Sequence, residues 1–486
     1  MNYSILHLSD LHRDLTNEIE NSALVESISR DMDRIALESP PIPRPTLCIV
    51  SGDLVYGVKA GNPNAPDELK RQYEQAEAFL IQISNELFAG DRDRVVILPG
   101  NHDVCVNTVL SSCVRIEIPP EPDQRRRLTN ELFNPRTDLR WSWTDLCFFR
   151  IERRDQYAAR LSAFSECYHG FYQGRRTYSL NPASQFDFFE FPSLNLSIAT
   201  LNSCYENDHF HRAGGFHPTC VSETSRQIRS ARHAGRLIAA TWHHSLFGGP
   251  MQDDYLDADV LQVLIDAGVS LGFHGHQHRS TFVDEFSRVG QLNRKITVFS
   301  ASTLCAGPTQ LTPGEPRGYN LIEIDAANWK GRAHQRRMVN ADFTLPIWGP
   351  GNFVEVGKSF LEFSICPPPT VRPPGIESRL SVEKAELFLS QKRWDEAILT
   401  LRSVPNDSFA RVLLAQAIEN SNDSKAALDL LWPPLTAKEA IIVGGAILES
   451  GNHELAGAFS NLPFIANNED PSVREIRRRI TERRIR

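Results

Sequence analysis

The sequence lacks any long apolar run, any Cys-x-x-Cys pair and any excess of basic charge. No uninterrupted apolar stretch reaches the roughly 18 to 20 residues that a membrane-spanning helix needs. The amino terminus shows no basic region followed by an apolar stretch and a cleavage site, so we expect no secretory signal and a cytoplasmic location. These absences argue against a membrane protein.

The nine cysteines stand singly along the chain, and their number is odd. Neither property suits a disulfide framework or a zinc ribbon, both of which need paired spacings. We therefore expect reduced thiols with structural roles. The positions are Cys48, Cys105, Cys113, Cys147, Cys167, Cys204, Cys220, Cys305 and Cys366.

The formal charge of −8 argues against a surface coated in basic residues. It leaves a local basic groove open, because electrostatic steering depends on the distribution of charge as well as on its sum. The length of 486 residues predicts two to three domains.

Strand and helix signals alternate near the amino terminus. Apolar runs predict strands over residues 3–8, 46–51 and 95–98, and helical patterns predict helices over 16–38 and 67–87. This alternation is typical of an α/β layer.

A segment of about residues 104–192 interrupts the alternation and is interpreted as an insertion over the edge of the sheet. It holds helical-looking pieces near 123–132 and 155–171. Beyond it we expect strands over 194–201, 237–241 and 269–273 and a helix over 257–267, and the apolar stretches 296–300 and 319–324 suggest a second, more antiparallel sheet. The expected fold class is α/β (α+β): a β-sandwich flanked by helices.

The proline-rich segment 367–375 is interpreted as a linker between a domain over 1–366 and a helical domain over 376–486. Within the helical domain, segments beginning at Trp394, Asp423 and Asn452 recur at intervals of about 30 residues. They resemble tetratricopeptide-like hairpins, and an ordinary helical bundle explains them equally well.

Five short polar motifs follow in order, most of them where a predicted strand ends. They are Asp10-Leu11-His12, Gly52-Asp53, Gly100-Asn101-His102-Asp103, His243-His244 and Gly275-His276-Gln277-His278. Residues at the carboxyl ends of strands can converge on one rim of a sheet. Carboxylates, imidazoles and amide oxygens are ligands for divalent Mn, Fe and Zn.

This pattern resembles the calcineurin-like metallophosphoesterase superfamily, whose motifs D-x-H, G-D, G-N-H-D/E, H and G-H-x-H are matched over about residues 1–325. The resemblance implies a phosphoesterase with two divalent metal ions, Mn first and Fe or Zn as alternatives, in which a bridging hydroxide attacks phosphorus. It implies that Asp10, His12 and His278 hold the first metal, that Asp53 bridges both, that Asn101, His243 and His276 complete the second, and that His102 sits beside the leaving group with Asp103 orienting it.

Two positions leave a choice. Relatives often read His-His-Pro with the first histidine as ligand, and Ser245 stands here in place of the proline, so we prefer His243 and keep His244 as the alternative. Tyr56 has the spacing of a purple acid phosphatase ligand, but those enzymes lack the histidine that His12 provides. Tyr56 is therefore expected in the pocket wall.

Three further histidines, His209, His211 and His217, are expected to line or flank the pocket in structural roles. The residues Leu54-Val55-Tyr56-Gly57 after Gly52-Asp53, and Asp103 after His102, differ from the motifs of serine/threonine protein phosphatases. These differences favour the branch of the superfamily that contains cyclic-nucleotide phosphodiesterases and DNA-processing nucleases.

Two arginine-rich segments bear on the substrate. Residues 115–176 hold twelve arginines against nine acidic residues, interleaved with aromatics, which suits either a grip on nucleic acid or a capping subdomain with its own core. Residues 474–486 hold seven arginines against two glutamates, which suits a basic tail or the polar end of a helix.

Three functions are therefore compared. The first is a phosphodiesterase or nuclease acting on nucleotides or nucleic acid, with a protein partner bound by the helical domain. The second is a phosphomonoesterase of small molecules or phosphoproteins. The third is a catalytically silent scaffold that acts through its helices.

Overall fold

The structure, a computed structural model, divides the chain into two compact units: Met1–Phe286 with Ile296–Pro368, and Ser287–Lys295 with Pro369–Arg486. It describes residues 2–16, 19–134, 137–246, 255–256, 259–286, 295–307, 310–311, 314–342, 344–353, 357–367, 376–402, 404 and 408–485. The predicted linker, 367–375, lies outside the described residues from 368 onward. The predicted domain boundaries stay predictions.

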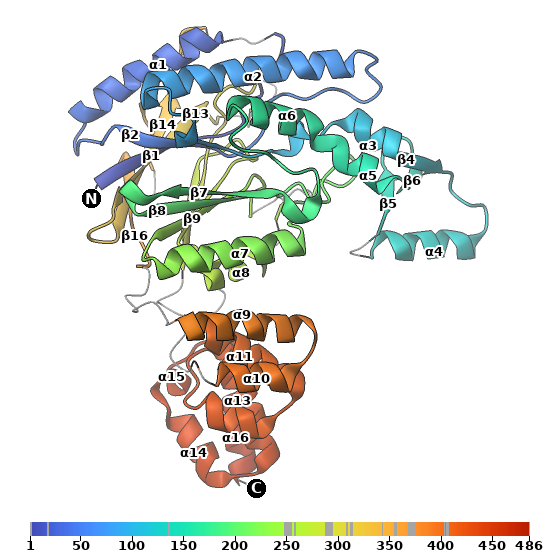
Figure 1. Cartoon of the computed structure of the whole chain (residues 1–486), viewed down its shortest axis with the longest axis vertical. Helices are drawn as coiled ribbons and strands as arrows, with labels where there is room; N and C mark the ends of the chain where they lie inside the picture. The colour runs from blue at the N-terminus through green and yellow to red at the C-terminus, as the bar shows by residue number, and fades with distance from the viewer. Residues whose placement is uncertain are drawn as a thin grey trace. The chain divides into compact units, whose positions relative to one another are not determined.

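Two β-sheets with helices on both outer sides make up the first unit (Figure 1). The first sheet has the order β15-β14-β13-β1-β2-β3, with β16 also pairing with β14, and the second has the order β11-β12-β10-β9-β8-β7. Helices α1 (Asn21–Arg34) and α2 (Ala65–Phe88) cover the first sheet, and α7 (Pro218–His233) and α8 (Asp259–Ala267) cover the second. The predicted sandwich flanked by helices is confirmed.

The strands of the first sheet are β1 (Asn2–Leu8), β2 (Pro45–Val50), β3 (Val95–Ile97), β13 (Gly318–Asp325), β14 (Lys330–Met338), β15 (Trp348–Pro350) and β16 (Phe360–Ser364). Those of the second are β7 (Phe186–Phe191), β8 (Leu196–Leu201), β9 (Leu237–Thr241), β10 (Leu271–His274), β11 (Thr281–Phe286) and β12 (Ile296–Ser300).

Side-chain alternation along the strands explains how the layers hold together. Successive residues on a strand point to opposite faces. On β8, Leu196 and Ile198 therefore join the core between the sheets, whereas Ala199 and Leu201 pack into the core beneath α7 and α8. With both faces covered, all six residues of the strand are buried, Ser197 and Thr200 included.

The first helix begins later than the sequence indicated. A helix from residue 16 was expected, but α1 begins at Asn21. The loop between β1 and α1 is held at the carboxyl end of the first sheet instead. The buried Arg13 donates to the carbonyl of Ile19 at 2.8 Å, and the backbone of Arg13 pairs with that of Val55.

The predicted insertion contains a small sheet that the sequence did not indicate, with the order β4-β6-β5. Its elements are α3 (Val106–Ser112), β4 (Cys113–Ile116), α4 (Pro122–Leu132), β5 (Leu139–Ser142), β6 (Cys147–Ile151), α5 (Arg154–Ala158) and α6 (Ser162–Phe171). Within the range expected for the insertion, β7 pairs antiparallel with β8 as the edge strand of the second sheet.

The later strands do not form a sheet of their own, so that prediction is wrong. β12 lies parallel beside β10 in the second sheet, and β13 lies antiparallel beside β1 in the first. Both strands are buried along nearly their whole length, and the sandwich provides cover on both of their faces.

The second unit is helical, as predicted. Its helices are α9 (Ile376–Ser390), α10 (Trp394–Leu401), α11 (Ser408–Ser421), α12 (Ser424–Leu430), α13 (Ala437–Ser450), α14 (His453–Asn461), α15 (Pro463–Ala466) and α16 (Pro471–Ile485). The arginine-rich end of the chain lies on α16, where Arg478 pairs with Glu475 and Glu482. Within the described ranges, no helix combines the length and the apolar character needed to cross a bilayer.

Arg336 on β14 ties α1 to the first sheet. Its guanidinium is 2.6 and 2.8 Å from the two carboxylate oxygens of Asp31, which also accepts from Tyr319 at 2.5 Å, and both charged side chains are at most 2% exposed. We expect Arg336→Ala to lower the free energy of unfolding by about 3 kcal/mol, because it leaves the buried carboxylate of Asp31 with only the half-exposed Arg34, at 3.3 Å, as a charged partner. Urea unfolding of the full chain measures this loss.

The control is Arg44→Ala, which removes a pair with Asp33 whose side chains are 52% and 66% exposed. This pair should contribute less than about 1 kcal/mol. Equal losses in the two variants would contradict the assigned role of Arg336.

Candidate functional site

The five motifs meet where parallel strands of both sheets end. Asp10 and His12 follow β1, Asp53 follows β2, and Asn101 and His102 follow β3. His243 follows β9, and His276 and His278 follow β10. Because β1, β2 and β3 are parallel neighbours, as are β9 and β10, their carboxyl ends form two rims that face each other.

One cluster joins the first and last motifs. Nε2 of His278 lies 3.2 Å from Oδ1 of Asp10 and 3.1 Å from Nε2 of His12. Nδ1 of His278 lies 2.9 Å from the carbonyl of Gln310, which can only accept, so Nδ1 carries a proton and Nε2 faces the cluster.

A second cluster centres on Asp53. Its Oδ2 lies 3.3 Å from Nε2 of His243 and 3.8 Å from Nε2 of His12, so this carboxylate reaches both clusters. Oδ1 of Asn101 lies 2.9 Å from Nε2 of His243 and 2.8 Å from Nδ1 of His276. The structure thus brings together all seven residues for which the sequence implied a metal.

Five of these residues have left-handed backbones. Their φ angles are 52° at Asp10, 44° at His12, 52° at Asp53, 76° at His276 and 52° at His278. Such a conformation costs of the order of 1 to 3 kcal/mol in a residue with a side chain and persists only where the surroundings enforce it. At two of these residues backbone bonds hold it: Asp10 N donates to Gly52 O at 3.1 Å and His12 N to Asp53 O at 3.0 Å.

The carboxylates of Asp10 and Asp53 stay ionised. Burial alone would raise the pKa of Asp10, but His278 and His12 outweigh it and hold the pKa well below its usual range. His243 likewise outweighs burial and lowers the pKa of Asp53. Conversely, burial would lower the pKa of His243, and Asp53 raises it to about 9. The site therefore draws positive charge into its centre.

His243 and His244 differ in what their rings face. Nδ1 of His243 lies 2.8 Å from the carbonyl of Ser51, so its Nε2 is directed at Asp53 and Asn101. Both nitrogens of His244 bond protein groups instead: Nδ1 lies 2.8 Å from Oγ of Ser203, and Nε2 accepts from Asn207 at 3.0 Å. His244 thus supports the loop beside the site.

The role implied for Asp103 needs correction. The ring of His102 is oriented by the carbonyl of Tyr56, which lies 2.7 Å from Nδ1. The carboxylate of Asp103 accepts from the Tyr73 hydroxyl at 2.8 Å and from the amides of Gly100 and Leu54 at 2.8 and 3.2 Å. Asp103 therefore fixes the loop backbone that carries His102, because its oxygens point at amides rather than at the imidazole.

A cleft of about 460 Å³ opens onto this site. Its walls come from the loop after Asp53, the Asn101–Val106 segment, the loop after β8 and His276: the residues are Tyr56, Gly57, Val58, Lys59, Asn101, His102, Val104, Val106, Asn207, Asp208, His209, Arg212 and His276. Tyr56, 39% exposed, lies in the wall as its sequence context indicated.

The other predicted histidines separate by position. His209 lines the cleft, and burial lowers its pKa. His211 lies outside the lining and bonds the carbonyl of Glu206 through Nδ1 at 3.1 Å. His217 accepts from the amide of Thr219 at the start of α7, which is a structural capping role.

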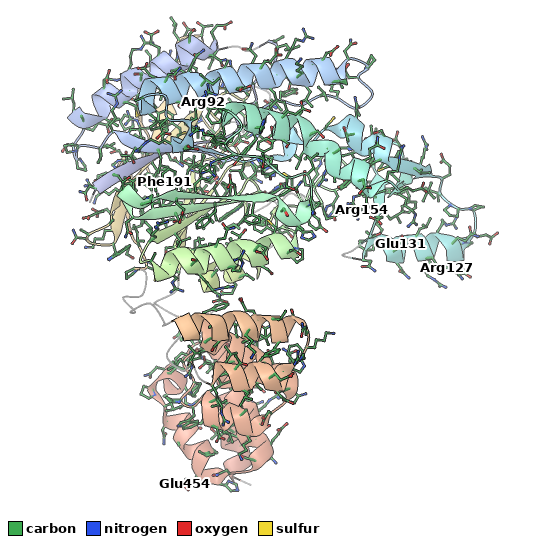
Figure 2. The ribbon with its side chains drawn as sticks, in the orientation of Figure 1. Arg92, Arg127, Glu131, Arg154, Phe191 and Glu454 are labelled. Atoms are coloured by element: carbon green, nitrogen blue, oxygen red, sulfur yellow. The ribbon has the colours of Figure 1, made fainter. Side chains whose placement is uncertain are left out.

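The arginines of the insertion are largely engaged within the protein. Salt bridges join Arg115 to Glu117, Arg126 to Asp123, Arg150 to Glu131, Arg154 to Asp138, Arg175 to Asp93, and Arg176 to Asp93 and Asp187. Most of the aromatics, such as Tyr157 and Phe171, are buried. Figure 2 shows Arg127 and Glu131 on α4, within an arm that stands out from the sandwich. These contacts fit the capping-subdomain interpretation.

Several residues that support the site could not be predicted from the sequence, because isolated polar residues form no recognisable motif. Oγ1 of Thr303 donates to the carbonyl of Asp10 at 2.7 Å, and Oγ of Ser203 accepts from the amides of His243 and His244 at 3.1 Å. Lys59 and Arg212 of the cleft wall were missed for the same reason.

A model of the calcineurin-like phosphoesterase family matches residues 3–280. No curated protein matches the chain. Among solved structures, a dimetal phosphatase from Danio rerio is similar at 11% identity and a TM-score of 0.39, over 74% of this chain and 98% of that one. The calcineurin-like phosphoesterase YfkN from Bacillus subtilis is similar at 12% identity and a TM-score of 0.29, over 86% and 98%. The family match spans more than half of the chain, which therefore belongs to the calcineurin-like phosphoesterases, metal-dependent hydrolases that use two metal ions.

Proposed function

We propose that the chain is a dinuclear phosphodiesterase or nuclease that acts on nucleotides or nucleic acid. The observation that carries the proposal is the cleft of about 460 Å³ lined directly by Asn101, His102 and His276. A cleft of this size accommodates a group well beyond a phosphate.

The ligand sets follow the two clusters. Asp10, His12 and His278 would hold one metal ion, Asn101, His243 and His276 the other, and Asp53 both. We propose Mn for these sites, with Fe or Zn as alternatives, because carboxylate, imidazole and amide-oxygen ligands suit all three ions. The fit is supported at His243, whose Nε2 lies 3.3 Å from an oxygen of Asp53 and 2.9 Å from the oxygen of Asn101, an arrangement that a shared proton or a cation stabilises.

Glycines make room for the ligands. A Cβ at Gly275 would lie 1.8 Å from Oγ of Ser9 and 2.5 Å from Oδ2 of Asp10. A Cβ at Gly100 would lie 2.2 Å from Oδ1 of Asp53. Both motif glycines are therefore needed for close approach to a carboxylate.

Two divalent cations would neutralise charge on a bound phosphate and lower the pKa of water enough to provide a nucleophile. His102 would act on the leaving group of the ester. Its Nδ1 is bonded to the carbonyl of Tyr56, which leaves Nε2 to donate to the departing oxygen when the ring is doubly protonated. The amide of His102 donates to Oδ1 of Asp53 at 2.8 Å, which couples its position to that of the carboxylate.

A diester is favoured over a monoester by the apolar and aromatic parts of the wall. Tyr56, Val104, Val106 and His209 offer surface to a substituent next to the phosphate, and aromatic rings stack on bases. A phosphomonoesterase remains the alternative. A catalytically silent scaffold is disfavoured by the full ligand set.

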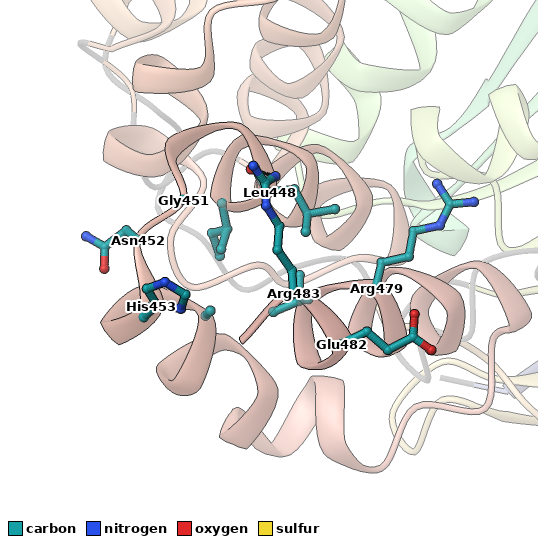
Figure 3. Close-up of a pocket in the computed structure, with 10 residues that line it drawn as sticks. Leu448, Gly451, Asn452, His453, Arg479, Glu482 and Arg483 are labelled. Atoms are coloured by element: carbon teal, nitrogen blue, oxygen red, sulfur yellow. Dashed lines mark hydrogen bonds between the residues drawn. The ribbon is translucent and has the colours of Figure 1, made fainter. Parts of the chain in front are cut away.

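For the helical unit we propose tetratricopeptide-like hairpins that bind a protein partner. The proposal is supported by three successive pairs, α9 with α10, α11 with α12 and α13 with α14, each joined by a short turn. A cavity of about 720 Å³ lies beside α13, α14 and α16. Figure 3 shows Arg483 in this cavity, where its guanidinium bonds the carbonyl of Leu448.

Replacing Gly275 should weaken metal binding without removing a ligand. We expect Gly275→Ala to weaken Mn²⁺ binding by roughly 10- to 100-fold, because the added methyl group displaces Asp10. Elemental analysis and titration of the purified chain measure this. The control is Gly215→Ala, since nothing lies within 4 Å of a Cβ there. Full metal content in Gly275→Ala would overturn the assignment of Asp10.

Hydrolysis of bis-p-nitrophenyl phosphate with added Mn²⁺ tests the activity itself. We expect the wild type to cleave this diester faster than p-nitrophenyl phosphate. His102→Ala should lower kcat by about 10²- to 10⁴-fold with metal retained, because it removes the proton donor. Asp53→Asn should lose both metal and activity.

The matched control is His169→Ala, which removes an exposed histidine of α6 outside the cleft. Its rate should equal that of the wild type. A metal-loaded wild type that is inert on both esters would favour the scaffold, and a preference for the monoester would favour the phosphomonoesterase.

A further inference from the structure

We infer that the cleft holds a second anion subsite, formed by Lys59 and Arg212, for a negatively charged group one nucleotide away from the scissile phosphate. The inference rests on the proposed phosphodiesterase function and narrows its substrate class to nucleotides with a second phosphate. Lys59 and Arg212 both line the cleft that opens onto Asn101, His102 and His276.

The two cations are exposed and lack acidic partners. Among the described residues, no carboxylate forms a salt bridge with Lys59 or Arg212, although many arginines of the same unit are paired. The chain as a whole carries a formal charge of −8, so unpaired positive charge in the substrate cleft is not a by-product of composition. Charge of one sign in a cleft attracts ligands of the opposite sign.

The acidic residue of the lining, Asp208, does not cancel this charge. Its side chain is fully buried, lies 3.0 Å from Nε of Arg140 and accepts from the hydroxyl of Tyr157 at 2.8 Å. Burial would raise the pKa of Asp208, but Arg140 outweighs it and holds the pKa low. The carboxylate charge is therefore already neutralised by the insertion.

The loop that carries Lys59 is fixed from beneath. Gln72 on α2, 1% exposed, accepts from the amide of Gly57 at 2.9 Å and donates to its carbonyl at 3.0 Å. Both backbone groups are thus held two residues before Lys59. A fixed backbone reduces the conformational entropy lost when the cation binds an anion.

The loop that carries Arg212 is fixed from the opposite side. The side-chain nitrogen Nδ2 of Asn207 donates to the carbonyl of Arg212 at 2.7 Å and to Nε2 of His244 at 3.0 Å. Asp208 accepts from the amides of Phe210 and His211 at 2.8 and 2.9 Å. Asn207 thereby connects the backbone of Arg212 to His244, the neighbour of His243. The guanidinium of Arg212 stays available to bind the ligand.

The test compares thymidine 5′-(4-nitrophenyl phosphate) with and without a 3′-phosphate, in the metal-loaded full chain. Released nitrophenol reports cleavage of the diester in both. We expect the 3′-phosphate to lower KM in the wild type, and Lys59→Gln and Arg212→Gln each to raise KM for that ester by about tenfold with kcat retained. KM for bis-p-nitrophenyl phosphate, which has no second phosphate, should stay unchanged.

Lys70→Gln on α2 is the control, because it removes an exposed lysine outside the cleft. Added salt should shrink the advantage of the 3′-phosphate, since exposed charges are screened. Equal KM values for the two thymidine esters in the wild type, or equal effects of the variants on both esters, would overturn the subsite. Inertness toward all three diesters would instead overturn the proposed function.

Discussion

The burial of two ionised carboxylates, Asp10 and Asp53, is the constraint on which the rest of the site depends. A carboxylate that is at most 1% exposed is strongly destabilised unless positive charge lies next to it. His278 and His243, at 3.2 and 3.3 Å, provide such charge when protonated, and a divalent cation would provide more of it. The negative site therefore belongs to the folded state itself, and cation binding relieves an electrostatic cost that folding has already incurred.

The β-sandwich holds these buried carboxylates next to the histidines that stabilise them. The carboxylates sit where strands of two different sheets end, and the Nδ1 hydrogen bond of His243 to the carbonyl of Ser51 joins the two rims at 2.8 Å. Left-handed backbones at Asp10 and Asp53 turn their side chains inward at a local cost. That cost is sustained because the parallel strands before each turn are buried along nearly their whole length, which holds the turns in place.

The metal ligands and their convergence could be predicted from the sequence, because apolar runs mark the strands and the polar motifs follow where those strands end. The hydrogen-bond partners that orient the histidine rings could not be predicted. Tyr56 orients His102 through its carbonyl, which any residue would supply, so no side-chain pattern marks the role. The resemblance implied that Asp103 orients His102, yet one of its oxygens binds backbone amides and the other the hydroxyl of Tyr73. The strand β7 was hidden because it lies at the end of an irregular segment and pairs with a strand that follows it.

The insertion supports one wall of the cleft through its arginines. Its arginine content suggested a grip on nucleic acid, but Arg140 reaches inward to Asp208 and Glu206, and Arg160 donates to the carbonyls of Cys204 and Tyr205. These arginines hold the loop that forms one wall of the cleft, and Asn207 continues the connection to His244. An insertion that braces a wall can shape the substrate cleft without touching the substrate, because it decides where that wall stands relative to the metal ligands.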